Sequence, residues 1–265
     1  MNLKGKERMA LDVLKGLGSV AVAFSGGTDS ALVCSLAREA LGDGAIAVTG
    51  RSPLFPAEEL EEARRAAGAI GIRMFEVDVP VMSDEGFVAN PADRCYRCKR
   101  LLLRAISDLA GGQGIRSVVD GGTEDDLADV RPGTRAGREQ GVRSPLQEAG
   151  MTKEDVRALS KTRGLPGWDK PSAACLASRI PYGTPITEEL LGRIGGAERF
   201  LRSNGFSRVR VRAHGRIARI EVEPGDMPRL LARREEVVRE LKKAGFIYVS
   251  LDMQGFRSGS MNEVL

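Results

Sequence analysis

Two cysteines lie three positions apart in the stretch DRCYRCKRLL, residues 93–102, although the chain of 265 residues contains only four cysteines. Cys95 and Cys98 stand at the head of an apparent helix and are surrounded by arginine and lysine. Thiolates at this spacing serve as nucleophiles in redox pairs and as ligands in metal sites. Taken alone, the two residues form a redox pair, half of a metal site or two unrelated parts of a core.

A second stretch whose residues could bind a ligand is the loop SGGTDS, residues 25–30, between an apolar segment and a helical pattern. Two glycines let backbone amides approach a ligand closely, and the N-terminus of the next helix offers N–H donors and a positive dipole end to phosphate. Asp29 is unusual in an anion-binding loop, and we expect it to hold Mg²⁺ that bridges the phosphates. The alternative is a simple glycine-rich turn in which Asp29 and Ser30 cap the helix.

The complete SGGxDS string resembles the PP-loop of ATP pyrophosphatases, which cleave ATP between the α and β phosphates. The chain has no Walker A loop, GxxxxGK[ST], and no GxGxxG after a predicted strand. The resemblance implies ATP and Mg²⁺ as ligands of the loop. The residues that it assigns to them here are Ser25, Gly26, Gly27, Asp29 and Ser30.

Two further segments agree with a nucleotide site of this type. VTGRSPLFP, residues 48–56, contains Thr49 and follows the second predicted strand, where members of this fold hold adenine and ribose. DGGTEDDLADVRPG, residues 120–133, follows the fourth strand and resembles the segment that closes over the nucleotide. Both lie where the strands of open α/β sheets end and bind ligands. The candidates in the second segment are Gly121, Thr123 and Asp125, although its aspartates alone would indicate solvated helix caps.

A third cysteine, Cys175, lies in WDKPSAACLASRIPYGTPIT, residues 168–187, among small side chains that leave its sulfur accessible. Lys170 and Arg179 are near it in the sequence, and cationic neighbours favour the thiolate. Cys34 lies within an apolar helical pattern and is expected in the core. Because His214 is the only histidine, this chain alone cannot supply a site with several histidines.

The PP-loop, the cysteine pair, the PSAAC segment and the RVRAH stretch, residues 210–214, together resemble the LarE family over essentially the whole chain. LarE proteins are ATP-dependent sulfur transferases that make the nickel-pincer nucleotide cofactor of lactate racemase. Their substrate is pyridinium-3,5-biscarboxylic acid mononucleotide. The resemblance implies that ATP adenylates a substrate carboxylate with release of pyrophosphate, and that sulfide then displaces AMP to give a thiocarboxylate.

The resemblance also assigns a role to the cysteines. In the family, the position of Cys175 handles sulfur. Some members sacrifice the sulfur of this cysteine and leave dehydroalanine, whereas others bind a [4Fe-4S] cluster through three cysteines. We expect Cys95, Cys98 and Cys175 to hold such a cluster, because three thiolates leave one iron open for the transferred sulfide. A sacrificed Cys175, a zinc site and a disulfide remain as alternatives.

An acidic substrate requires cations, and the stretch RVRVRAH, residues 208–214, contains three arginines that alternate with apolar residues. Arg208, Arg210 and Arg212 are therefore expected on one face of a strand, and arginine pairs with phosphate and carboxylate in a bidentate manner. A solvated strand face is the alternative for this pattern alone. The resemblance adds Arg179 and Glu198 as further substrate-binding candidates.

The elements that must position these residues follow an alternating pattern in the first half of the chain. Apolar strands at 19–24, 45–50, 72–79 and 117–122 alternate with helical patterns. This alternation predicts an α/β fold of the PP-loop (adenine nucleotide alpha hydrolase-like) type, with a parallel sheet and helices on both faces.

The second half of the chain has a different pattern. Residues 123–186 are expected to be irregular, with one helix that Thr152 caps. After them, a helix–strand–strand–helix–strand pattern predicts a small C-terminal α+β domain. We expect an ATP-binding domain at 1–165, a cysteine-containing connecting segment at 166–186 and a domain for substrate binding or oligomerisation at 187–265.

Composition limits the class of protein. Hydrophobic residues make up 42% and charged residues 29%, as in globular proteins, and no apolar run reaches the length of about 18 residues that a membrane span needs. The N-terminal segment carries charges throughout, which indicates a helix instead of a signal peptide and predicts a cytoplasmic protein. The net charge of +4 suits nucleic acid or phosphorylated small molecules, and the low aromatic content of 5% disfavours nucleic acid.

We therefore expect a small nucleotide substrate, sulfide or another sulfur donor, and no membrane or nucleic-acid partner. The family resemblance adds a homo-oligomer. The main alternative is a tRNA-thiolating PP-loop enzyme with a [4Fe-4S] cluster, which shares the adenylation step. An ammonia-dependent PP-loop amidase or a nucleotide sensor would not need the three cysteines.

Overall fold

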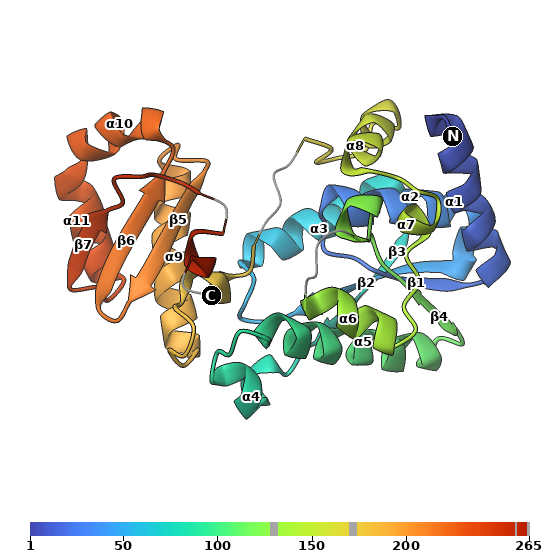
Figure 1. Ribbon diagram of the computed structural model, residues 1–265, viewed down its shortest axis with the longest axis horizontal. Helices are drawn as coiled ribbons and strands as arrows, with labels where there is room; N and C mark the ends of the chain where they lie inside the picture. The colour runs from blue at the N-terminus through green and yellow to red at the C-terminus, as the bar shows by residue number, and fades with distance from the viewer. Residues whose placement is uncertain (128–131, 170–173, 258, 264–265) are drawn as a thin grey trace. The chain divides into compact units, whose positions relative to one another are not determined.

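The computed structural model describes residues 1–127, 132–169, 174–257 and 259–263. The chain forms two compact units (Figure 1). The N-terminal unit comprises Met1–Val81 and Asp93–Ala173, and the C-terminal unit comprises Met82–Ala92 and Ala174–Leu265. The short segment Met82–Ala92 therefore leaves the first unit, joins the second and returns just before the cysteine pair.

The N-terminal unit contains a parallel four-stranded sheet in the order β3-β2-β1-β4. Its strands are β1 (Val20–Ala23), β2 (Ala45–Arg51), β3 (Arg73–Asp78) and β4 (Ser117–Val119). Val22 in the centre of β1 pairs with Ala47 on one side and with Val119 on the other. Because all four strands run in the same direction, their carboxyl ends meet at one edge, where the segments that follow them can form a site.

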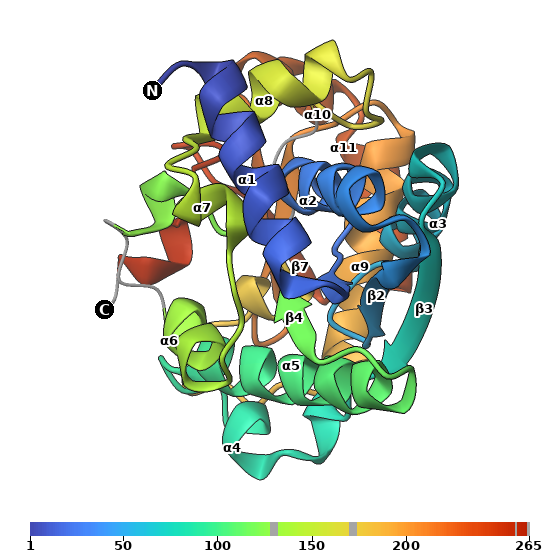
Figure 2. The ribbon, with the colours of Figure 1, turned by 90° about the vertical axis from the view of Figure 1, so that its right-hand side faces the viewer.

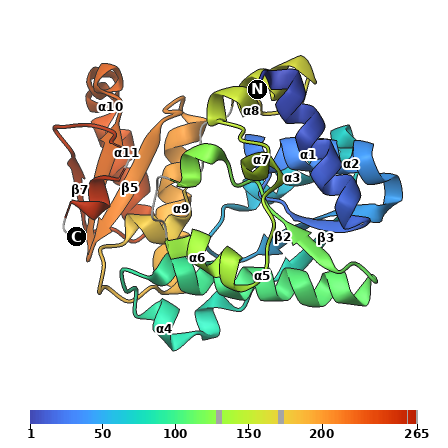
Figure 3. The ribbon, with the colours of Figure 1, turned by 45° about the vertical axis from the view of Figure 1, so that its right-hand side comes forward.

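Helices cover both faces of this sheet, as Figures 2 and 3 show. The helices of this unit are α1 (Leu3–Leu17), α2 (Thr28–Leu41), α3 (Ala57–Ile70), α5 (Arg94–Gly112), α6 (Pro132–Glu139), α7 (Pro145–Glu148) and α8 (Lys153–Thr162). Val20 and Val22 pack with α1, α2 and α8, whereas Ala21 packs with α5 on the opposite face. Successive strand residues thus enter two different cores, which explains why β1 is apolar on both sides.

The C-terminal unit contains a three-stranded sheet in the order β5-β6-β7, in which β5 and β6 are antiparallel and β6 and β7 are parallel. Its elements are α4 (Glu85–Val88), α9 (Glu188–Ser203), β5 (Val209–His214), β6 (Ile217–Val222), α10 (Met227–Ala232), α11 (Arg234–Lys243) and β7 (Tyr248–Leu251). The apolar residues of β5, Val209 and Val211, are fully buried. The arginines that alternate with them therefore occupy the other face of the strand.

Two expectations from the sequence are wrong. Residues 123–186 contain three α-helices, α6, α7 and α8, instead of one. Helix α6 was not predicted because Gly133 and Gly137 lower its helix propensity. The helix is stabilised by packing on α5, where Gly133 lies close to the backbone of Cys95. The helix predicted between β6 and β7 is two helices, which meet at Arg233, where the side chain donates a hydrogen bond to Asn204 Oδ1 (2.6 Å).

The other predicted elements are present. Thr152 caps α8, and its side chain and that of Asp155 form a reciprocal capping box. Within the described part of the chain, no helix combines the length and apolarity that a membrane crossing requires.

Candidate functional site

The loop between β1 and α2 depends on Gly26. This residue has φ of 73°, and a Cβ on it would lie 3.1 Å from Cβ of Ala63 on α3. Backbone conformation and close approach both favour glycine here. The next residue, Gly27, caps α2 without any side-chain hydrogen bond to the first turn. The N–H groups of this turn therefore lack a capping side chain and are oriented to bind an anion.

The two serines of the loop have different environments. Ser30 is buried, and its hydroxyl donates to the carbonyl of Gly27 (3.0 Å) while the Ser25 amide approaches it at 3.3 Å. Ser25 is exposed, and its Oγ lies 3.2 Å from that of Ser30. Ser30 thus fixes the shape of the loop from inside, whereas Ser25 presents a hydroxyl at its surface.

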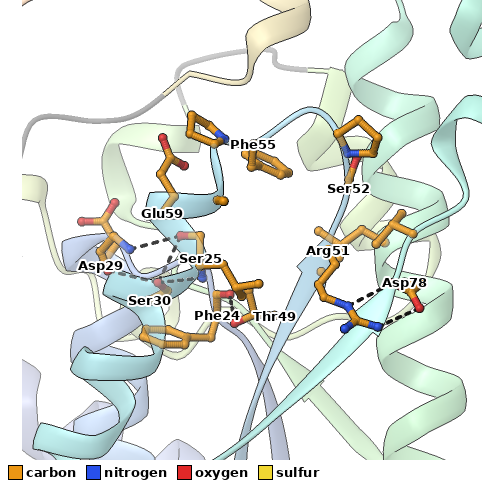
Figure 4. Close-up of a pocket in the computed structure, with 18 of the residues that line it drawn as sticks. Phe24, Ser25, Asp29, Ser30, Thr49, Arg51, Ser52, Phe55, Glu59 and Asp78 are labelled. Atoms are coloured by element: carbon orange, nitrogen blue, oxygen red, sulfur yellow. Dashed lines mark hydrogen bonds and ion pairs between the residues drawn. The ribbon is translucent and has the colours of Figure 1, made fainter. Parts of the chain in front are cut away.

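A cavity of about 690 Å³ opens beside this loop (Figure 4). The loop with Ser25, Asp29 and Ser30 lies on one side of the cavity, and the ion pair between Arg51 and Asp78 lies on the other. The residues that line the cavity come from the carboxyl ends of the strands and from α2, α3, α5 and α8. The polar and charged residues among them include Ser25, Asp29, Ser30, Thr49, Arg51, Asp78, Lys153 and Arg157. The volume is that of a typical pocket for a nucleotide-sized ligand.

Asp29 projects from the first turn of α2 beside two cations. Burial raises the pKa of Asp29, and the charges of Lys153 and Arg157 partly offset this effect. Both cations belong to α8, where they are four residues apart and therefore share one face. The cavity thus combines helix N–H donors, two cationic side chains and one carboxylate, which suits a polyphosphate with its divalent cation.

The remaining nucleotide candidates lie at different depths. Thr49 lines the cavity, is buried and donates to the carbonyl of Phe24 (2.8 Å). Gly121 lies against the loop, because a Cβ on it would be 2.9 Å from the backbone of both Asp29 and Ser30.

Thr123 and Asp125 are not among the residues that line the cavity. Thr123 is buried and donates to Asp126 through its amide and hydroxyl, whereas Asp125 accepts from the amide of Lys153 (2.6 Å). Both residues support neighbouring structure here. Residues 128–131 of the predicted closing segment lie outside the described residues.

In the C-terminal unit, a buried ion pair joins the turn that carries Cys175 to helix α9. Arg179 donates to Glu198 through Nε (2.9 Å) and Nη2 (3.1 Å), and both side chains are almost fully buried. Its Nη1 donates to the carbonyls of Ala174 (2.6 Å) and Cys175 (2.9 Å). Arg179 therefore holds the backbone on which Cys175 is carried.

Glu198 is the acceptor at the centre of this arrangement. It accepts hydrogen bonds from Arg179, from Arg202 and from the amide of Val211 (3.0 Å) on the edge strand β5. Burial alone would raise the pKa of Glu198, but the hydrogen bond and charge of Arg179, the charge of Arg202 and the hydrogen bond from Val211 together lower it. The carboxylate is thus held in its ionised form.

The three arginines around β5 differ in their partners. Arg212 is buried and pairs with Glu221 (2.8 Å) and with Ser260 Oγ (3.0 Å). Arg208 precedes β5, is exposed and pairs with Glu223 (2.8 Å). Across the described part of the chain, Arg210 forms no ion pair.

The cationic environment of Arg210 also distinguishes it. Burial, followed by the nearby charge of Arg179, lowers the pKa of Arg210 to about 10, so the side chain remains cationic at neutral pH. Its guanidinium stacks on the ring of Phe256 at 5.1 Å. Among the described arginines of this strand, Arg210 is therefore the cation with no carboxylate of its own.

The cysteines fall into two groups by burial. Cys34 is completely buried in the core of the N-terminal unit, and burial strongly raises the pKa of its thiol. Cys95 is exposed and Cys98 half-buried, both in the first turns of α5, and the half-buried Cys175 precedes the turn Leu176–Arg179. None of the four is in a disulfide. Lys170, expected near Cys175, lies outside the described residues, as do residues 171–173.

Sequence comparisons identify the family. The chain is 41% identical over 264 residues to the pyridinium-3,5-bisthiocarboxylic acid mononucleotide synthase of Lactiplantibacillus plantarum, with 99% of this chain and 96% of that protein covered. The chain belongs to the LarE family. An uncharacterized protein of Synechocystis is 44% identical over 92% of each chain. No family model matches the chain.

A more distant relation supports the fold of the LarE chain. Argininosuccinate synthase of Haloarcula marismortui, a PP-loop synthetase, is 30% identical over 57% of this chain and 39% of that protein. The parallel sheet, the covering helices and the loop at Gly26 have the arrangement of this fold. The family and the PP-loop fold predicted from the sequence are thus confirmed.

Several residues that line the cavity were not predicted from the sequence as site residues. Lys153 and Arg157 follow Thr152, which was recognised only as a helix cap. Their spacing of four residues beside a recognised N-terminus was the available signal. Arg51 and Asp78 end neighbouring strands and pair in register, but strand order is needed to bring them together.

Proposed function

We propose that this protein is an ATP-dependent sulfur transferase that converts a carboxylate of pyridinium-3,5-biscarboxylic acid mononucleotide into a thiocarboxylate, in biosynthesis of the nickel-pincer nucleotide cofactor. The observation that carries the proposal is the 41% identity to the named synthase over 99% of this chain. The PP-loop cavity and the accessible cysteines are the features of this chain that such a reaction would use.

ATP and Mg²⁺ occupy the cavity of the N-terminal unit in this proposal. The amides at the start of α2 and the hydroxyl of Ser25 hold phosphate oxygens, and Asp29 binds the cation that bridges them. Lys153 and Arg157 line the same cavity and neutralise charge that develops on pyrophosphate. A carboxylate oxygen of the substrate attacks the α-phosphorus, the bond to the β-phosphate oxygen breaks, and an acyl-adenylate forms.

The substrate carries carboxylates and a phosphate, and Arg210 is its best-placed ligand in the C-terminal unit. Arg210 has no ion-pair partner among described residues, whereas Arg208 has one exposed partner that a ligand could replace. Arg212 and Arg179 already pair with buried carboxylates. We therefore assign direct substrate binding to Arg210 and Arg208, and a supporting role to Arg179, Arg212 and Glu198.

Sulfide completes the reaction by attack on the acyl carbon, which releases AMP and leaves sulfur in place of the departed oxygen. We propose that Cys95, Cys98 and Cys175 hold a [4Fe-4S] cluster. The donor set fits, because all three thiols have surface access and none is in a disulfide. Among the described residues, no group of three or more His, Cys, Asp or Glu side chains is already arranged to hold a metal ion. When bound, the cluster would supply an open iron for sulfide.

The activity is tested by incubating the protein with Mg²⁺, ATP, sulfide and the dicarboxylated nucleotide under anaerobic conditions. We expect pyrophosphate, AMP and a product in which one oxygen is replaced by sulfur, identified by mass spectrometry. Unfractionated tRNA serves as the alternative acceptor. Sulfur incorporation into tRNA, with none into the nucleotide, would overturn the proposal.

The source of sulfur is tested with two alanine variants. If three thiolates hold a cluster, Cys95→Ala and Cys175→Ala both lose iron, acid-labile sulfide and sulfur transfer. If Cys175 is sacrificed, Cys95→Ala stays active, and the spent wild-type protein is lighter by one H₂S at Cys175. Cys34→Ala is the matched control, since its buried thiol takes no part in either mechanism.

We also propose a homo-oligomer in the cytoplasm, where thiols stay reduced. The edge strand β7 of the C-terminal unit exposes Tyr248 at 66%, and Met253 just beyond it at 85%. Unpaired strand edges with exposed apolar side chains favour association. Light scattering should give a mass above that of one chain, and Tyr248→Lys should lower it.

A further inference from the structure

Asn90 combines an unusual backbone conformation with complete burial. Its φ is 57°, which makes it the one non-glycine residue with positive φ among those described, and it is completely buried. Asparagine tolerates this conformation better than most residues, but glycine would tolerate it as well. The conformation alone therefore does not explain an amide side chain at this position.

The side chain of Asn90 binds the segment that follows the Cys175 turn. Its Nδ2 donates to the carbonyls of Pro181 (2.8 Å) and Thr184 (2.9 Å). The backbone adds two bonds between the same segments, because the carbonyl of Asn90 accepts from the amide of Gly183 (3.0 Å) and that of Val88 accepts from the amide of Ile186 (2.8 Å). Residues 88–90 are thus bound to residues 181–186 by side chain and backbone together.

These contacts join two segments of the C-terminal unit that lead along the chain to the cysteines. Cys95 follows Asn90 by five residues, which span at most about 18 Å of extended chain. On the other side, Pro181 follows Cys175 by six residues, and Arg179 holds the carbonyl of Cys175 (2.9 Å). This limit on the reach of Cys95 comes from the covalent chain and holds for any arrangement of the two units.

We propose that Asn90 is a positioning residue for sulfur transfer, which holds the segment leading to Cys95 and Cys98 against the segment following Cys175. The inference rests on the proposed function, in which these three thiols act together. Asn90 belongs to the C-terminal unit, whereas the PP-loop belongs to the N-terminal unit. Its loss should therefore reduce sulfur transfer and leave adenylation intact.

The test uses Asn90→Gly, because glycine accepts the positive φ and lacks the side-chain amide that donates to Pro181 and Thr184. Dibromobimane, a short thiol cross-linker, is applied to the metal-free full-length protein, and cross-linked peptides are identified by mass spectrometry. In the wild type we expect cross-links from Cys175 to Cys95 or Cys98. In Asn90→Gly we expect about tenfold fewer of these, as for loss of one net buried hydrogen bond, with the Cys95–Cys98 cross-link unchanged.

A second readout separates positioning from general structural damage. Substrate-dependent pyrophosphate release should stay within about twofold of the wild type in Asn90→Gly, while thiocarboxylate per AMP falls about tenfold. Gly183→Ala, which strains the partner segment at φ of 77°, should reproduce this uncoupling if Asn90→Gly folds poorly. Equal cross-linking in both Asn90→Gly and wild type overturns the role of Asn90. Absence of the Cys175 cross-link from the wild type itself would instead refute the shared three-cysteine site.

Discussion

Replacement of Glu198 by alanine should destabilise the C-terminal unit by about 3–5 kcal/mol, the usual cost of leaving a buried charge without its partner. Glu198 is completely buried and Arg179 is 2% exposed. The substitution leaves Nε and Nη2 of Arg179 and the amide of Val211 without their acceptor. Water cannot readily replace it, because all of these donors lie inside the fold.

Hydrogen exchange at the amides of β5 and β6 measures the opening free energy of this unit directly. Glu223→Ala is the matched control, because it removes the same type of side chain from an ion pair of 2.8 Å with Arg208 in the same unit. Both members of that pair are about half exposed, so the expected loss is about 0–1 kcal/mol. Equal losses in the two variants would refute the assignment of Glu198 as the buried anchor of the Cys175 turn.

The same prediction has a defined pH dependence. Since the pKa of Glu198 is lowered in the folded protein, its stabilising contribution is present above the ordinary glutamate pKa of about 4.3. It is lost as the pH falls through the lower folded value. The stability difference between wild type and Glu198→Ala should therefore be constant near neutrality and shrink in acid. A difference that grows in acid would contradict this reasoning.

Three further predictions concern the ligands. Asp29→Ala should abolish pyrophosphate release and retain the fold by circular dichroism, because it removes the proposed Mg²⁺ ligand; an active variant would contradict the loop assignment. Lys153→Ala should move the acid limb of the pH profile for ATP use to higher pH, since Lys153 lowers the raised pKa of Asp29; an unchanged limb would count against that coupling. Arg210→Ala should raise KM for the carboxylated nucleotide about tenfold or more with little change for ATP, and Arg208→Ala should have the smaller effect. Equal losses for both substrates would place Arg210 at the nucleotide.

The sequence was sufficient for the features that depend on local pattern. The strands of the parallel sheet, the loop at residues 25–30 and the cap at Thr152 follow from apolar runs, glycine conformation and side-chain hydrogen bonds within a few residues. Helix α6 lacked such a signal, because its glycines disfavour a helix and its stability comes from packing on α5. Local patterns also gave no indication that Met82–Ala92 belongs to the C-terminal unit.

The roles of the arginines could not be read from alternation alone. Arg210 and Arg212 are two residues apart on one strand, yet only Arg212 pairs with Glu221 (2.8 Å), which lies on the neighbouring strand β6. Likewise, alternation gave no indication that Arg179 contacts the turn at Cys175, and the prediction that Arg179 binds substrate stays a prediction. Such assignments depend on which carboxylates the tertiary fold brings close, and this information is spread over distant parts of the chain.

The most direct test of the central claim is the fate of the substrate oxygen. The dicarboxylated nucleotide is labelled with ¹⁸O in its carboxylates and converted with Mg²⁺, ATP and sulfide, and the products are separated and weighed by mass spectrometry. If a carboxylate oxygen attacks the α-phosphorus and sulfide then breaks the carbon–oxygen bond, each AMP carries one ¹⁸O from the substrate and the pyrophosphate carries none. A thiocarboxylate formed together with unlabelled AMP, or label in pyrophosphate, would contradict adenylation of the carboxylate by this protein.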